Sequence, residues 1–98
     1  MKAVVMARPE PHSLELWDKP IPVPGDGDIL VKVTAAAICG TDVHIREWND
    51  WSRRRMSPPV TIGHELVGEV VEIGKNVRGI RVGDTVTPES HIPCGVCP

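Results

Sequence analysis

Proline and glycine divide this chain into segments that are too short for long helices. The sequence carries ten Pro and nine Gly among 98 residues. Proline fixes φ and removes a backbone donor, and glycine permits tight turns, so both interrupt regular elements. The apolar runs between them consist mostly of Val, Ile and Leu, which favours strands over helices. We therefore expect a mainly β fold, a partly open barrel, with at most one or two short helices.

The individual elements follow from local patterns. A short helix is expected over residues 42–48, because Thr41 or Asp42 can cap its first turn. Residues 49–59 contain three consecutive Arg and two Pro, and they predict an irregular surface loop. The predicted strands are residues 2–6, 14–19, 29–33 with a continuation over 35–38, 67–73 and 85–87. Since the chain has no Phe or Tyr and only three Trp, aliphatic side chains must fill the core of this single domain.

Charge and cysteine content exclude several classes of function. A formal charge of −2 and a pI near 6.0 give no electrostatic reason to expect nucleic acid or an anionic membrane as a partner. No stretch approaches the ~18 apolar residues of a membrane span. The apolar start is too short for a secretory signal, so a cytoplasmic protein is expected. Three Cys make an odd count, which argues against a complete disulfide framework and favours metal binding or burial.

Two clusters of metal-ligand side chains stand out in the middle of the chain. Gly63 precedes His64 and Glu65, whose side chains could approach one ion only if the backbone bends at the glycine. The alternative is an ordinary polar pair at a strand entrance. Cys39 ends an apolar run, and a thiolate with an imidazole suits zinc, although a lone Cys is more often a core residue. Asp42 either accepts a hydrogen bond from the second ring N–H of His64 and so orients that imidazole, or is a plain helix cap.

The last residues contain a C-x-x-C pair, Cys94 and Cys97. Its spacing fits half of a structural zinc site, a redox dithiol or chance, and the zinc reading fits best because no βαβ unit is visible. His91 just upstream is by itself more often solvated than functional. Because the sequence stops directly after the pair, we expect a fragment of a longer chain that ends inside the zinc lobe.

Two further features have an ordinary explanation. Residues 53–55 are three Arg, which could bind a phosphate but more often form a solvated surface. Trp48 and Trp51 could line a pocket or simply pack over an apolar edge.

Taken together, these motifs resemble a known family. The run from Gly63 to Gly68, followed by Gly74 and Val77, looks like the zinc signature of the medium-chain alcohol dehydrogenases. Residues 38–42, 82–84 and the cysteine pair occur in the order typical of that family. The resemblance covers nearly the whole chain as the front part of a GroES-like catalytic domain. Within the family, residues 41–51 and 89–92 are similar to the threonine dehydrogenase branch.

The resemblance implies a role for each matching residue. Cys39, His64 and Glu65 would bind a catalytic Zn²⁺, and Cys94 and Cys97 a structural one. Thr41 and His44 would relay the proton of the substrate hydroxyl to solvent. His91 and Trp48 would lie near the substrate, a small alcohol such as L-threonine.

The resemblance also implies an oxidoreductase that transfers a hydride to NAD, with NADP not excluded, in a homo-oligomer. No G-x-G-x-x-G motif occurs in the sequence, so the dinucleotide-binding domain is missing and this chain alone should be inactive. The alternatives are a polyol or other secondary-alcohol dehydrogenase of the same family, and a non-catalytic GroES-like zinc-binding module.

Overall fold

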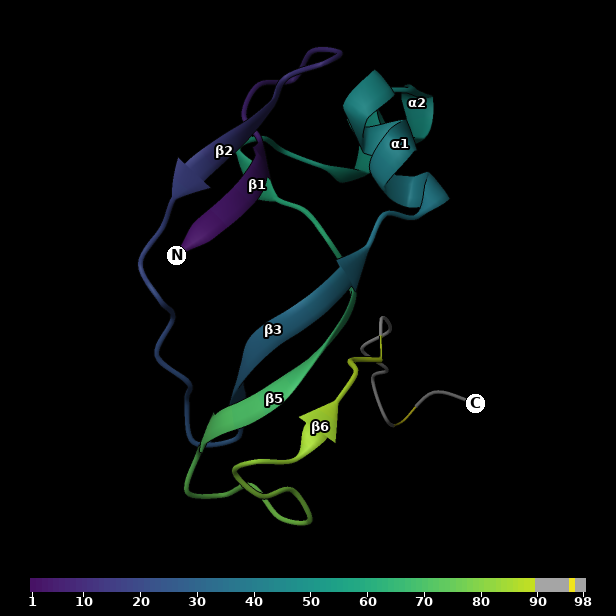
Figure 1. Ribbon diagram of the computed structural model, residues 1–98. Coiled ribbons are helices and arrows are strands. Elements are labelled where there is room, and N and C mark those ends of the chain that lie inside the picture. The colour runs from purple at the N-terminus through teal and green to yellow at the C-terminus, as the bar shows by residue number, and fades with distance from the viewer. Residues whose placement is uncertain (90–95, 97–98) are drawn as a thin grey trace.

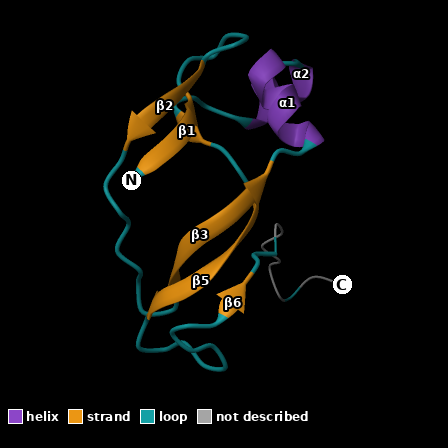
Figure 2. Cartoon of the chain, viewed as in Figure 1, coloured by secondary structure: helices purple, strands orange, loops and turns teal. Residues whose placement is uncertain are grey.

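Two small antiparallel sheets and a pair of short helices make up the molecule. The computed structural model describes residues 1–89 and residue 96 (Figures 1 and 2). One sheet has the strand order β2-β1-β4 and the other β3-β5-β6, and every pairing is antiparallel. The elements are β1 (Lys2–Met6), β2 (Leu14–Asp18), β3 (Ile29–Ala37), α1 (Gly40–Glu47), α2 (Asp50–Arg55), β4 (Val60–Thr61), β5 (Glu65–Ile73) and β6 (Thr85–Val86). The mainly β prediction is confirmed.

The hydrophobic core lies between the first sheet and helix α1. Met6 of β1 packs against Ile45 and Trp48, and each of these three side chains is buried. Partly buried residues surround them: Leu14, Met56, Val60 and Ile62. Because one face of α1 is held by this core, the opposite face is free to present polar side chains.

Helix α1 is fixed at both ends. At its N-terminus, the Asp42 carboxylate accepts a hydrogen bond from the backbone N–H of Cys39 at 3.1 Å, which forms half of a capping box. Near its C-terminus, Glu47 lies 3.1 Å from the His12 ring in the turn between β1 and β2. The hydrogen bond with His12 lowers the pKa of Glu47 below its usual range. These contacts hold the helix in place against the first sheet.

The prediction of an irregular loop over residues 49–59 is wrong in its first half. Residues Asp50–Arg55 form helix α2. The side chain of Asn49 accepts the backbone N–H of Ser52 at 3.0 Å, and the buried Ser52 hydroxyl donates to the carbonyl of His44 at 3.0 Å. Arginine is a good helix former, so the three consecutive Arg continue the helix that Asn49 begins.

The longest pairing in the molecule joins β3 to β5. Its register places Ile29 opposite Ile73 at one end and Ala37 opposite Glu65 at the other. Two irregularities interrupt this pairing before Ala35, and the pairing from Ala35 to Ala37 is regular. The residues that follow β3 therefore lie beside the residues that precede β5.

Candidate metal centre

The candidate metal centre lies where β3 ends and β5 begins. Cys39 is two residues beyond the end of β3, and His64 is one residue before the start of β5. Although these residues are 25 positions apart, the Cys39 Sγ atom lies 3.1 Å from His64 Nε2. One atom each of Cys39, His64 and Glu65 lie within 4.8 Å of one another. The β3–β5 register thus brings the Cys39 side chain next to His64 and Glu65, which are far from it in the sequence.

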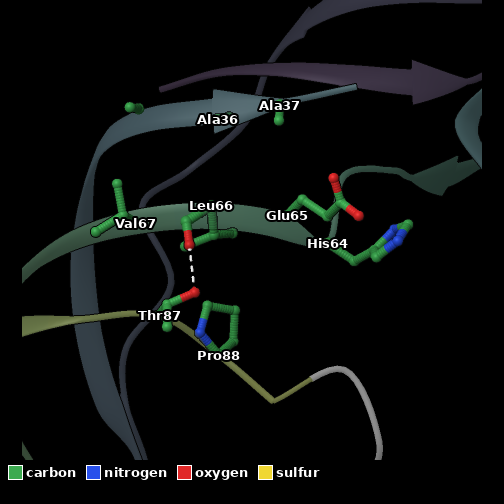
Figure 3. A pocket seen from close by; sticks show the side chains of 9 residues that line it. Ala36, Ala37, His64, Glu65, Leu66, Val67, Thr87 and Pro88 are labelled. Atoms are coloured by element: carbon green, nitrogen blue, oxygen red, sulfur yellow. Dashed lines mark hydrogen bonds between the residues drawn. The ribbon is translucent and has the colours of Figure 1, made fainter. Parts of the chain in front are cut away.

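Gly63 lets two neighbouring side chains serve one centre. Its φ of +106° is in a region that residues with a side chain rarely adopt. The chain bends at this glycine just before it enters β5, so His64 is not yet part of the regular strand. Figure 3 shows the His64 ring and the Glu65 carboxylate next to each other at the start of β5. His64 and Glu65 could approach one ion only if the backbone bends at Gly63, and the structure has this bend.

The donor set fits a zinc ion. A thiolate, an imidazole and a carboxylate are the ligand types that zinc accepts in catalytic sites. In a tetrahedral zinc site, the sulfur and nitrogen ligands would be roughly 3.6 Å apart, given the usual bond lengths. The observed 3.1 Å is about half an ångström shorter, a difference that side-chain rotation accommodates. Cys39 is also the N-cap of α1, and its Sγ atom accepts a hydrogen bond from the Thr41 N–H at 3.3 Å. The N-terminus of a helix favours an anionic side chain such as a thiolate.

Asp42 acts as a capping residue and keeps one oxygen without a partner. Its Oδ2 atom accepts the Cys39 N–H, whereas its Oδ1 atom is buried and has no hydrogen-bond partner among the described residues. The contact to Cys39 steadies the backbone of a candidate ligand. A role toward His64 stays a prediction, because among the described residues the Asp42 carboxylate has a hydrogen bond to Cys39 alone.

Thr41 and His44 lie on the same side of α1. They are three positions apart, which places them on one helical face. Together with Asn49 and Trp51 they line a hollow of about 340 Å³. A hydroxyl and an imidazole that line one hollow near the candidate metal ligands are suited to proton transfer.

The two neighbouring tryptophans have different surroundings. Trp48, for which the resemblance implied a substrate contact, lies in the core with 6% of its surface exposed. Trp51 is 41% exposed and lines the hollow with Thr41 and His44. Their spacing in the sequence does not distinguish which of the two tryptophans lines a pocket and which is buried. The left-handed backbone of Trp48 at the end of α1 turns this residue inward.

A second hollow of about 500 Å³ opens between β3, β5 and the segment after β6. Figure 3 shows its lining and the hydrogen bond of 2.8 Å that Thr87 donates to the carbonyl of Leu66. Apart from His64, Glu65 and Thr87, the lining is aliphatic: Ala35, Ala36, Ala37, Leu66, Val67 and Pro88. Two of the three candidate metal ligands, His64 and Glu65, therefore border a mainly aliphatic hollow.

Three predicted site residues lie outside the part of the chain that the structure describes. They are His91, Cys94 and Cys97. Their substrate and structural-zinc roles stay predictions. Among the described residues, no helix is long and apolar enough to cross a membrane.

Sequence reasoning missed Asn49, and it considered Arg55 only as one of three Arg that bind a phosphate or form a solvated surface. Asn49 lines the polar hollow and caps α2, and the Arg55 guanidinium lies over the Trp51 ring at 5.1 Å from its centroid. The available signal was the spacing of Asn49 and Ser52, which is typical of a helix start. It was outweighed by the Arg and Pro content of the segment.

Comparisons with known proteins agree with the fold. The model of the alcohol dehydrogenase GroES-like domain matches residues 25–98, so the chain belongs to this family. It is 50% identical to the L-threonine 3-dehydrogenase of Pyrococcus furiosus over 97 residues, which are 99% of this chain and 28% of that protein. The predicted family and its threonine dehydrogenase branch are confirmed as the chain's relatives.

Solved structures give the same fold. Zinc-dependent alcohol dehydrogenase 2 of Streptococcus pneumoniae in its apo form has a TM-score of 0.81 at 31% identity, and the match covers 99% of this chain and 27% of that one. An Escherichia coli alcohol dehydrogenase complexed with NADH has a TM-score of 0.80 at 35% identity, covering 99% and 26%. The chain thus spans about a quarter of the length of the proteins that it matches.

Proposed function

We propose that this chain is the N-terminal part of the catalytic domain of a zinc-dependent, nicotinamide-linked dehydrogenase that oxidises L-threonine at its 3-hydroxyl. The convergence of Cys39, His64 and Glu65 carries the proposal. The identity of 50% to an L-threonine 3-dehydrogenase supports the choice of substrate. The domain extends beyond residue 98 in this proposal, and the homo-oligomeric state of the whole protein remains a prediction.

Cys39, His64 and Glu65 would hold the zinc ion. Zinc supplies Lewis acidity, which makes a nearby hydroxyl group more acidic at neutral pH. Cys39 is held by the capping contacts of α1 and His64 by the bend at Gly63, so these two ligands are positioned before any ion binds. Cys94 and Cys97 would hold a separate structural ion.

Thr41 and His44 move the proton in the proposed reaction. The Thr41 hydroxyl accepts the proton of the substrate hydroxyl and passes its own proton to the His44 imidazole. His44 is exposed and releases the proton to solvent. The carbon that bears the hydroxyl gives up its hydrogen as a hydride to the nicotinamide, whose chemistry belongs to the cofactor. His91 would help to position the substrate.

A comparison of substrates tests this function. In the full-length protein with NAD or NADP, we expect kcat/KM for L-threonine to exceed the values for sorbitol and 2,3-butanediol. An α-amino acid needs partners for its charged groups, and a site that provides them discriminates strongly against substrates without them. If a polyol or diol wins by more than tenfold, the threonine assignment is wrong. If no secondary alcohol is oxidised, the chain belongs to a non-catalytic zinc-binding module.

Replacing His44 tests the proton relay. We expect His44→Gln to lower kcat about 10²- to 10⁴-fold with a smaller change in KM, because acid–base help acts in the transition state. His12→Gln is the matched control, since His12 is an exposed histidine whose partner is Glu47 rather than a residue of the hollow. Equal kcat values for wild type and His44→Gln would remove His44 from the relay.

A further inference from the structure

The polar hollow is rich in hydrogen-bond donors and carries no acidic side chain in its lining. Its lining residues are Thr41, His44, Asn49 and Trp51. The lining of the aliphatic hollow includes the Glu65 carboxylate and no cationic residue other than a histidine. An anionic group of a substrate would be repelled at the second hollow and accommodated at the first.

The orientation of the Asn49 amide is determined by its hydrogen bonds. Its Oδ1 atom accepts a hydrogen bond from the backbone N–H of Ser52 at 3.0 Å. A backbone N–H can donate only to the oxygen of the amide, so the NH₂ group must point the other way. Its two N–H donors remain for a ligand of the hollow.

Arg55 supplies a guanidinium that lies over Trp51, one of the residues that line this hollow. Its Cζ atom lies 5.1 Å from the centroid of the Trp51 ring, a distance that fits a cation–π contact. The contact restricts a long and otherwise mobile side chain, so less entropy is lost when a ligand binds it. Arg55 has no ion pair among the described residues, and its planar fork matches a carboxylate.

The other charges of α2 do not compete for this role. Arg53 donates to the Trp48 carbonyl at 3.1 Å and lies 3.7 Å from the Asp50 carboxylate. This ion pair balances the charge of Asp50, which lies between Asn49 and Trp51 in the sequence. Arg54 carries the same charge as Arg55 but makes no contact with Trp51.

We infer that Arg55, held against Trp51, and the amide of Asn49 bind the carboxylate of the substrate and so determine specificity for a hydroxy amino acid. The inference rests on the proposed function, because it places the substrate hydroxyl beside Thr41 and the metal cluster. In L-threonine, only a few bonds separate the hydroxyl from the carboxylate. Thr41 lines the polar hollow and its backbone N–H contacts the Cys39 sulfur, so a substrate whose hydroxyl lies at Thr41 can extend into this hollow.

The test compares L-threonine with L-threoninol, in which a hydroxymethyl group replaces the carboxylate. In the full-length protein, we expect Arg55→Gln to raise KM for L-threonine about 10- to 100-fold, the range of a charged hydrogen bond, while kcat stays within about threefold. The same variant leaves KM for L-threoninol unchanged. Arg54→Gln, the matched control, leaves both substrates unchanged.

A binding measurement separates this inference from the proposed function. Tryptophan fluorescence reports the binding of L-threonine without turnover, and we expect Arg55→Gln to weaken this binding by the same factor. Loss of turnover with every alcohol, together with weaker L-threonine binding by Arg55→Gln, refutes the proposed function and supports the anion site. Normal L-threonine turnover with unchanged KM and binding in Arg55→Gln overturns the anion site and leaves the function intact.

Discussion

His64→Ala is expected to remove one equivalent of zinc per chain from the full-length protein and to lower kcat/KM at least about 10³-fold. The imidazole is one of the three side chains proposed to bind zinc, and a site left with Cys39 and Glu65 has too few donors to retain the ion. The loss of several kcal/mol of Lewis-acid stabilisation corresponds to this change in rate. Elemental analysis of the purified protein measures the metal, and steady-state kinetics with L-threonine measures the rate.

Two controls make this result specific. His12→Ala removes a histidine that pairs with Glu47 and should retain both zinc and activity. The circular dichroism spectrum of His64→Ala should match that of the wild type, because His64 is only half buried and lies outside the core. Full zinc content together with activity within tenfold of the wild type would refute the metal centre.

Gly74→Ala is expected to lower the free energy of unfolding by about 3 kcal/mol. A Cβ atom at this position would collide with the backbone carbonyl oxygens of Gly25 and Asp26. Those atoms belong to a turn that is itself closed by a hydrogen bond of 3.1 Å from the Asp28 N–H to the Gly25 carbonyl. The turn can yield only by moving backbone, which costs about 1–3 kcal/mol, and by weakening the Gly74–Asp28 hydrogen bond, which costs about 1 kcal/mol.

Urea-induced unfolding measures this effect. Gly27→Ala is the matched control, because a Cβ atom there meets nothing within 4 Å and the substitution lies in the same turn. We expect the control to change the free energy of unfolding by less than about 0.5 kcal/mol. Equal unfolding midpoints for Gly74→Ala and Gly27→Ala would show that the two turns do not pack as closely as the structure indicates.

Much of the fold could be predicted from the sequence because its signals are local. Strands over 2–6 and 67–73 follow from short Val-rich runs between turn residues. A helix in this region was predicted with Thr41 or Asp42 as its cap, whereas the structure begins it at Gly40 with Cys39 as the N-cap. Helix α2 was missed because the Arg and Pro content of residues 49–59 masked the cap formed by Asn49 and Ser52. The composition of this segment predicted a loop, whereas the capping side chain of Asn49 decided that a helix forms.

The candidate site was predictable in its chemistry and not in its arrangement. The sequence indicated Cys39, His64 and Glu65 because few other functions bring together a thiol, an imidazole and a carboxylate near glycines. It did not separate Trp48 from Trp51, since both lie at pocket-like spacing. Only the structure shows that one is in the core and the other in the hollow.

The sequence by itself determined the β-rich character of this protein and the types of ligand that it offers to a metal. These properties depend on residue type and on near neighbours along the chain. The tertiary structure alone decided that Ala37 lies opposite Glu65, which brings Cys39 to His64, and that Gly68 and Gly74 face backbone atoms too closely to carry a side chain. Such contacts join segments far apart in the sequence, and their register depends on the packing of the whole sheet rather than on any local preference.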